Sequence, residues 1–167
     1  MKPPFPRPAF AAIAAPSAGT GSAMTRRFIL LAAMACHLAP AGARAQSSDA
    51  AAISRRMMEL FDKPDQPLTV DPIVVADGFA IAGWTQGDLG GRALLRRDHG
   101  GWRIILCSGD ALTAAPLIEQ AGASAAVAAT LVQRLAAAEA AIDPARRAYF
   151  SRFQGVVPVE DGAHHHG

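Results

Sequence analysis

Apolar residues between positions 49 and 61 recur at spacings of three and four, which is the period of one face of an amphipathic helix. The residues on this stripe are Ile53, Met57, Leu60 and Phe61. Two prolines in segment 62–67 stop the pattern, because neither can continue a helix. The pattern predicts a first helix over 49–61 with one buried face.

Four apolar runs follow, separated by turns rich in glycine and aspartate, a pattern typical of antiparallel hairpins. The runs cover 68–75, 79–86, 92–97 and 102–107, and the glycine-rich segment 87–91 is predicted as a turn. Pro72 indicates that the first run lies at a sheet edge, because proline cannot donate a ladder hydrogen bond. The last run is apolar on both faces, so we expect it to be central, with helices packed across it. Its apolar residues, which we expect to be well buried, are Trp102, Ile104, Ile105 and Leu106.

The remainder of the chain carries helix signals. Asp110 can cap a helix over 111–121 that Gly122 ends, and Ser124 can cap the next helix. Asp143 followed by Pro144 marks the start of a last helix, with proline at its first position. The apolar residues of the last two helices are Val127, Leu131, Leu135 and Ile142, and then Tyr149, Phe150 and Phe153.

These signals predict an α+β fold, with an N-terminal helix, an antiparallel meander of three to four strands, and two to three C-terminal helices. We expect one domain over 46–155 and a flexible, histidine-containing tail over 156–167. The order of elements resembles that of cystatin-like and NTF2-like folds, by topology only.

Residues 1–45 have the pattern of an export signal. Arg26 and Arg27 precede a short apolar run over 28–35, and small residues flank Arg44 in 43–45. A basic start, an apolar core and a small-x-small site predict a secretory signal peptide with cleavage after Ala45. The apolar run is shorter than the roughly 20 residues that span a bilayer. We therefore expect a periplasmic or secreted protein without stable membrane insertion after cleavage.

Other interpretations of this leader stay open. Met24 is a candidate for the true translation start, because a complete signal follows it. Arg26 and Arg27 also fit a twin-arginine signal in part. Cys36 is a candidate for lipidation, although Ala33 stands where a lipobox usually has leucine. A lipoprotein is therefore the alternative to a soluble periplasmic protein.

Charge and cysteine content exclude a nucleic-acid-binding protein and a small protein stabilised by disulfides. Residues 1–45 hold five of the 16 Lys and Arg residues and none of the 14 Asp and Glu residues, so residues 46–167 have a net charge of −3. No basic stripe is left for a nucleic acid. Cys107 is the only cysteine after the leader and cannot form an internal disulfide. We expect it to be an inert, buried thiol.

The most distinctive residues for chemistry are His164, His165 and His166. Neutral imidazole suits copper, zinc and nickel, and adjacent histidines on a flexible chain can share one ion. A merely polar tail or a remnant of an affinity tag is the alternative explanation. Met58 is a further candidate ligand, because thioethers favour Cu(I), whereas Met57 fits the apolar stripe and is expected in the core.

Enzyme motifs are missing from the sequence. It contains no glycine-rich phosphate loop that opens a helix, no G-x-S-x-G elbow and no H-E-x-x-H helix. Ser108 lies in a short Ser-Gly-Asp segment, but the histidines after the leader lie in the turn at His99 and in the tail. A catalytic triad therefore has no base of evident position, and we predict that the protein is not an enzyme.

Five segments and the His-bearing end resemble one family of exported bacterial proteins. The segments are LFDKPDQPL (60–68), AIAGWTQG (80–87), GGRALLRR (90–97), LCSGDAL (106–112) and FQGVV (153–157). The family is that of the copper uptake system-associated proteins. The resemblance implies an accessory protein that works beside copper acquisition machinery, such as an outer-membrane copper receptor. The histidines of the tail are the only site residues that it transfers.

We therefore predict a periplasmic accessory protein of copper acquisition, which binds copper or hands it to a receptor or transporter. Copper would be cargo that folding does not require. The first alternative is a protein–protein adaptor of a copper transport system that binds no metal. The second is a small enzyme with a pocket in its sheet.

Overall fold

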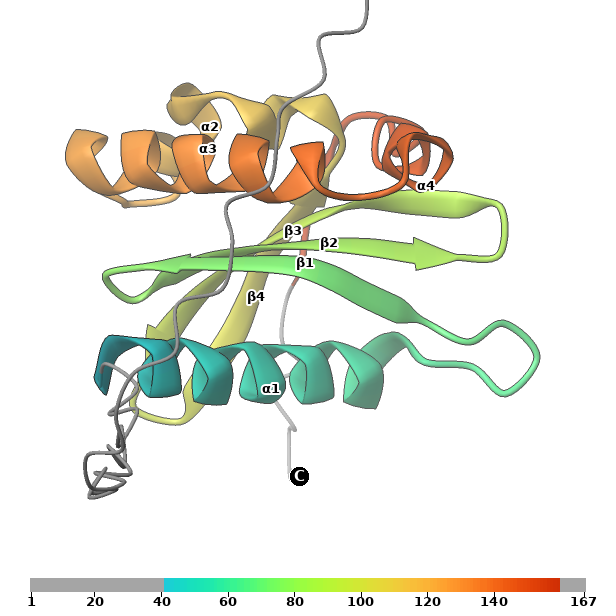
Figure 1. The fold of residues 1–167 in the computed structure, drawn as a ribbon, viewed down its shortest axis with the longest axis horizontal. Coiled ribbons are helices and arrows are strands. Elements are labelled where there is room, and N and C mark those ends of the chain that lie inside the picture. Colours follow the sequence, from blue (N-terminus) through green and yellow to red (C-terminus); the bar gives the residue numbers. More distant parts are fainter. Residues whose placement is uncertain (1–40, 160–167) are drawn as a thin grey trace, which may run out of the picture. The chain divides into compact units, whose positions relative to one another are not determined.

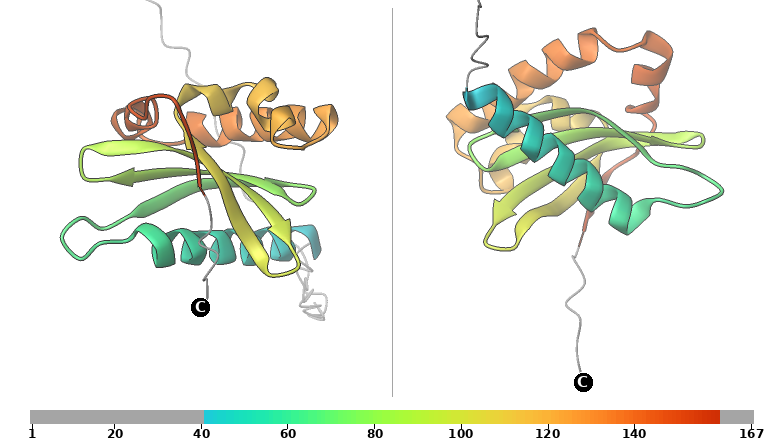
Figure 2. Two further views of the ribbon diagram at one scale, coloured as in Figure 1. Left: turned by 180° about the vertical axis from the view of Figure 1, so that it is seen from behind. Right: turned by 60° about the horizontal axis from the view of Figure 1, so that its bottom comes forward.

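The structure is a computed structural model that describes residues 41–159, with side chains from residue 45 onward. An antiparallel sheet lies between one N-terminal helix and a layer of C-terminal helices (Figure 1). Helix α1 (Ala41–Phe61) covers one face of the sheet, and the later helices lie on the other side (Figure 2). These are α2 (Ala115–Gln120), α3 (Ala125–Ala140) and α4 (Pro144–Tyr149). The predicted α+β class and the order of its elements are confirmed.

The sheet is a meander in which each strand pairs with the next one along the chain. Its strands are β1 (Thr69–Ala76), β2 (Phe79–Gln86), β3 (Leu89–Asp98), β4 (Gly101–Ser108) and β5 (Val156–Pro158). β1 lies at an edge, as Pro72 indicated. β4 was expected at the centre, but its outer neighbour β5 has three residues and pairs only with the end of β4. The segment that we expected to begin a flexible tail therefore starts with a paired strand.

A bulge in β4 explains a second difference from expectation. Leu94 pairs with Leu106 and Leu95 with Ile104, so Ile105 is an extra residue on its strand. Residues two apart in a regular strand share a face. Here Ile104 packs in the core beneath α1 and Leu106 in the core beneath α3. The bulge changes the phase of the alternation, and it leaves Ile105 half-buried where we expected full burial.

Helix α1 begins eight residues before the predicted start at position 49, in a segment rich in alanine. It therefore includes the bond after Ala45 where we expect signal cleavage. The buried stripe of α1 consists of Ile53 and Met57, with Phe61 partly buried beside them. Leu60, which we placed on that stripe, is exposed.

Two of the three predicted helix caps are confirmed. Ser124 Oγ accepts a hydrogen bond from the Val127 amide at 3.3 Å. The Asp143 carboxylate accepts from two amides of α4, at 2.9 and 3.1 Å. Asp110 does not cap a helix. The expected helix over 111–121 is divided into a short 3-10 helix, η1 (Asp110–Thr113), and α2, and the residue before η1 is Gly109.

Asp110 lies instead at the exposed edge of a charge cluster around the buried Arg92 of β3. The Arg92 side chain is 3% exposed, and it donates two hydrogen bonds to the Glu139 carboxylate at 2.6 and 2.7 Å. Its Nη1 lies 3.2 Å from Asp110 Oδ1, which also accepts from Ser151 Oγ at 2.7 Å. The guanidinium lies over the Phe150 ring, 5.5 Å from its centroid. One arginine thus joins β3 to α3, η1 and the segment after α4.

Glycines in β3 let this last segment lie directly on the sheet. We predicted a turn over 87–91, but the turn consists of Gly87 and Asp88 alone, and Gly90 and Gly91 lie in β3. A Cβ on Gly90 would lie 2.8 Å from the Tyr149 Cβ, and one on Gly91 would lie 2.9 Å from the Phe153 Cβ. Side chains at these positions would force the C-terminal segment away from the sheet.

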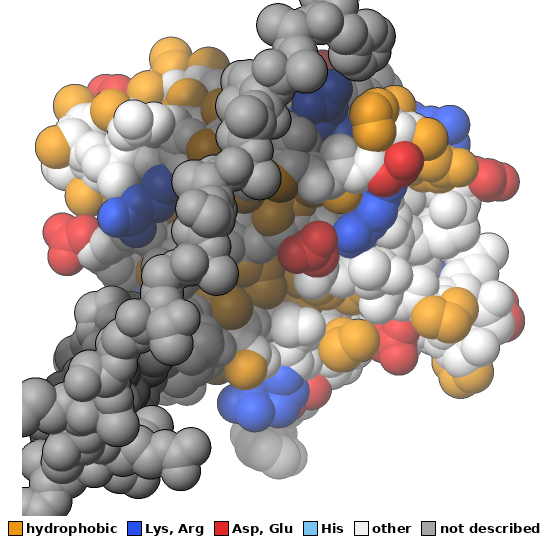
Figure 3. Space-filling model, viewed as in Figure 1, with side chains coloured by type: hydrophobic (Ala, Val, Ile, Leu, Met, Phe, Trp, Pro, Cys, Tyr) orange, Lys and Arg blue, Asp and Glu red, His pale blue; other side chains and the backbone are white. Residues whose placement is uncertain are grey.

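The surface seen in Figure 3 mixes charges of both signs, which lie singly or in small groups rather than as one stripe. Hydrophobic side chains appear among them near α2 and α3. Most of the exposed side chains of α3 are alanines. This face therefore offers only shallow apolar surface, and the deeper apolar surface lies beneath α1.

Candidate functional site

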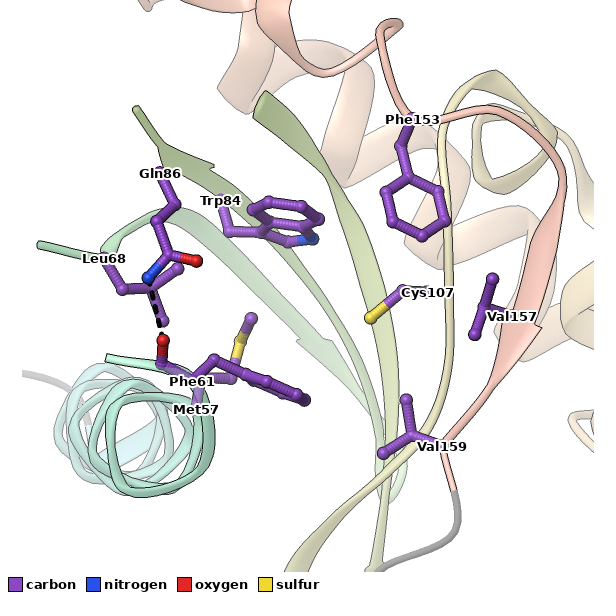
Figure 4. Close-up of a pocket in the computed structure, with 9 residues that line it drawn as sticks. All are labelled: Met57, Phe61, Leu68, Trp84, Gln86, Cys107, Phe153, Val157 and Val159. Atoms are coloured by element: carbon purple, nitrogen blue, oxygen red, sulfur yellow. Dashed lines mark hydrogen bonds between the residues drawn. The ribbon is translucent and has the colours of Figure 1, made fainter. Parts of the chain in front are cut away.

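An apolar pocket lies between α1 and the sheet, near the C-terminal end of the helix (Figure 4). Its volume is about 220 Å³. The side chains around it come from the helix, the loop that follows, β2, β4 and the C-terminal segment. The lining residues are Met57, Phe61, Leu68, Trp84, Gln86, Cys107, Phe153, Val157 and Val159. None of these side chains is charged.

Hydrogen bonds hold the rim of the pocket where α1 ends. Gln86 Nε2 donates to the carbonyl oxygens of Phe61 at 2.8 Å and Gln66 at 2.9 Å. Asp62 Oδ1 accepts from the Leu68 amide at 2.7 Å and closes the loop between them. Both hydrogens of the Gln86 amide are therefore directed to backbone, and its Oε1 faces the interior on the side of Trp84 (Figure 4).

Trp84 is the largest side chain among the lining residues and the only tryptophan among them. The residue is 9% exposed, and its Nε1–H is buried without a hydrogen-bond partner. The ring meets Phe153 edge to face, with centroids 5.7 Å apart and planes at 78°. The nitrogen edge is turned toward the space between Cys107 and Phe153 (Figure 4). The pocket therefore contains one fixed donor in apolar surroundings.

Two sulfur-containing side chains face this space from different elements. Cys107 lies on β4, and burial raises the pKa of its thiol from the ordinary 9.0 to about 11. The thiol is neutral at pH 7, which agrees with the buried cysteine that we expected. Met57 lies on α1 and is 1% exposed, as its place on the apolar stripe predicted. The two residues lie on different sides of the pocket (Figure 4).

A second hollow, of about 460 Å³, lies beside α1 and the β3–β4 turn and is polar. Four of its five charged residues form two ion pairs. Arg103 lies 3.3 Å from Asp98, and Arg56 lies 3.7 Å from Glu59. Arg55 also lines the hollow, so three arginines face two carboxylates and the lining has an excess of one positive charge.

The predicted metal ligands are only in part within the described residues. Met58 lies on α1 and is 43% exposed, with Ser54 Oγ 3.9 Å from its sulfur. His164, His165 and His166 lie outside residues 41–159. His99 is exposed in its turn, as expected. Within the part of the chain that the structure describes, no three His, Cys, Asp or Glu side chains are grouped closely enough to hold a metal ion.

Sequence reasoning did not identify the pocket. Trp84 and Gln86 are two positions apart in β2 and share a face, and Met57 and Phe61 are four apart in α1. Those spacings also describe ordinary core packing, so they do not distinguish a cavity from a filled interior.

No helix among residues 41–159 combines the length and the apolar character needed to cross a membrane. None of the protein families, the curated proteins or the solved structures compared with this chain matches it.

Proposed function

We propose that this chain is an exported accessory protein of copper acquisition, which binds copper as cargo and passes it to a receptor or transporter. The sequence resemblance, the signal-like leader and the histidine tract support the proposal. The observation that carries it is one of the fold. Two residues that line the pocket beneath α1, Met57 and Val159, are followed along the chain by the expected ligands.

The connection runs through two lining residues. Met57 lines the pocket from α1 and is followed by Met58, whose side chain is exposed. Val159 lines the same pocket, and His164 follows it by five residues. Five residues of chain span at most about 18 Å. We propose that, within this span, the imidazoles of the tract and the thioether of Met58 share one ion.

The chemistry of these ligands suits capture and transfer. Thioethers are soft ligands that favour Cu(I), and imidazole binds copper when it is neutral. Free histidine titrates near pH 6.5. Copper held by the tail is therefore retained at neutral pH and released as the imidazoles take up protons or as a partner supplies stronger ligands.

Calorimetric titration with Cu(II) tests the proposal, with the chain in which His164, His165 and His166 are all alanine as the main variant. We expect the wild-type chain to bind at pH 7 and to lose affinity at pH 5, where the neutral fraction of an imidazole is about 20-fold lower. The triple variant should lose this component, and the control His99→Ala should keep it. Because these histidines lie in the tail that we expect to be flexible, all chains should melt at the same temperature without metal.

A competition assay with a Cu(I) chelator tests the thioether. Met58→Leu should weaken Cu(I) binding, whereas the control Leu60→Ala, at another exposed position of α1, should not. Equal copper affinity in the wild-type chain, the triple variant and Met58→Leu would refute the metal-binding proposal. The adaptor that binds no metal would then be the better account.

A further inference from the structure

We propose that the apolar pocket beneath α1 binds a small, neutral, largely apolar molecule that carries one hydrogen-bond acceptor. The donor that holds this molecule is Nε1–H of Trp84. This inference uses neither the histidine tract nor copper, so it stands or falls independently of the proposed function.

The first argument is the unpartnered donor. Buried indole N–H groups normally have a hydrogen-bond partner, because a buried polar group without one is unfavourable. Trp84 Nε1 has none, and the side chain lines the pocket with its nitrogen edge turned inward (Figure 4). The indole of Trp102 is also buried without a partner, but it borders the polar hollow and does not line this pocket. Trp84 Nε1 exposes less than 1 Å² of surface, so an acceptor in the pocket beneath α1 would satisfy this donor after a small shift of the indole or of Phe153.

The second argument is that the donor is held in place before any ligand arrives. Phe153 meets the indole edge to face on one side. On another side, Gly91 leaves just enough room, because a Cβ at that position would lie 3.0 Å from Trp84 Cζ2. The ring is therefore oriented by its neighbours, and little conformational freedom is lost when an acceptor binds to it.

The third argument concerns charge. No lining side chain is charged, and the Cys107 thiol remains protonated at neutral pH. A charged ligand would lose its hydration here without gaining an opposite charge. The Gln86 amide is held by Phe61 and Gln66 and presents its oxygen to the interior (Figure 4). The occupant is therefore a neutral molecule such as an aryl ketone, ester or phenol.

The fourth argument concerns size. The pocket has a volume of about 220 Å³. An apolar cavity of about 150 Å³ accommodates benzene, and sites for drug-sized ligands start at about 300 Å³. The volume therefore fits a single ring with a short substituent, and it is too small for a long acyl chain or a nucleoside.

The test compares two probes of similar shape, acetophenone with an acceptor oxygen and ethylbenzene without one, on the full chain. Two-dimensional proton–nitrogen NMR resolves the indole N–H signals of Trp84 and Trp102. Acetophenone should shift the Trp84 signal and leave the Trp102 signal unchanged. Binding constants from the same titrations should favour acetophenone in the wild-type chain.

Trp84→Phe removes the donor and keeps an aromatic wall, and Trp102→Phe is the matched control. In Trp84→Phe, acetophenone should bind about 2- to 12-fold more weakly, the loss expected for one neutral hydrogen bond, while ethylbenzene binds within twofold of wild type. Trp102→Phe should change neither affinity. The proposal is overturned if acetophenone leaves the Trp84 signal in place, or if Trp84→Phe weakens both probes equally.

Discussion

The buried ion pair between Arg92 and Glu139 gives the sharpest test of the fold. The change is Glu139→Leu, which keeps side-chain volume and removes the carboxylate that accepts two hydrogen bonds from the guanidinium. Arg92 stays charged, buried and short of a partner. Removing one member of such a pair typically costs about 3–5 kcal/mol of unfolding free energy.

The remaining partners of Arg92 are the Phe150 carbonyl oxygen at 3.5 Å and the Asp110 carboxylate, and they cannot replace the lost one. The Asp110 side chain lies 3.2 Å away but is 67% exposed, and exposed ion pairs contribute only about 0–1 kcal/mol. We therefore expect a loss near 3 kcal/mol, measured by urea unfolding followed by circular dichroism at pH 7. The control Glu119→Leu replaces an exposed carboxylate of α2 and should change stability by less than about 0.5 kcal/mol.

A double variant separates the cost of an unpaired charge from the loss of packing. Arg92→Met combined with Glu139→Leu removes both charges and keeps apolar contacts with Phe150, so it should be more stable than Glu139→Leu alone. If Glu139→Leu costs less than about 1 kcal/mol, the pair is not buried as described and the assignment of Arg92 as the link between sheet and helices is wrong.

Three further predictions concern a thiol, a strand and the leader. Burial raises the pKa of Cys107 to about 11, so the folded chain keeps a proton that the unfolded chain loses near pH 9. Stability should fall between pH 9 and 11 by about 2–3 kcal/mol more in wild type than in Cys107→Ala, and equal pH slopes in urea unfolding would contradict this. Ile104→Ala should cost about 2–5 kcal/mol, and Ile105→Ala less than half of that, because only Ile104 is fully buried. Equal losses from these two substitutions would argue against the bulge. Intact-mass measurement of exported protein should find a chain that begins at Gln46, and a species with a lipid-modified Cys36 would show a different route of export.

Features that depend on neighbouring residues could be predicted from the sequence. Ser124 and Asp143 cap helices through bonds to amides two or three residues away, so a short motif contains the whole interaction. Pro72 marks an edge strand because of its own missing donor. The strands between Phe79 and Ser108 could be predicted for the same reason, because alternation and turn residues are signals within each segment.

Features that depend on distant residues could not be predicted. Arg92 has the sequence pattern of an exposed strand residue, and its burial is decided by Glu139, 47 positions later. β5 carries two exposed valines, so it has no burial pattern, and the free edge of β4 determines its pairing. The Ile105 bulge likewise follows from pairing with β3.

The same distinction between local and distant interactions applies to the candidate site. Cys107 and Met57 were expected to be buried, and they are. Their place around a cavity depends on how five segments meet. Seven of the nine lining residues nevertheless belong to the segments that carry the family resemblance. The histidine tract lies outside the described residues, and its role stays a prediction.

The short strand β5 makes one wall of the pocket easier to detach than the others. It is held by the pairing of three residues with β4, by the hydrogen bond from Val159 to Ile105 and by that from Ser108 to Gly155. Opening it would uncover Val157, Val159 and the cavity behind them while the four-stranded meander stays intact. Such local opening takes less free energy than global unfolding. Of the segments around the pocket, the C-terminal one is therefore the one that we expect to open first, because the fewest backbone hydrogen bonds hold it.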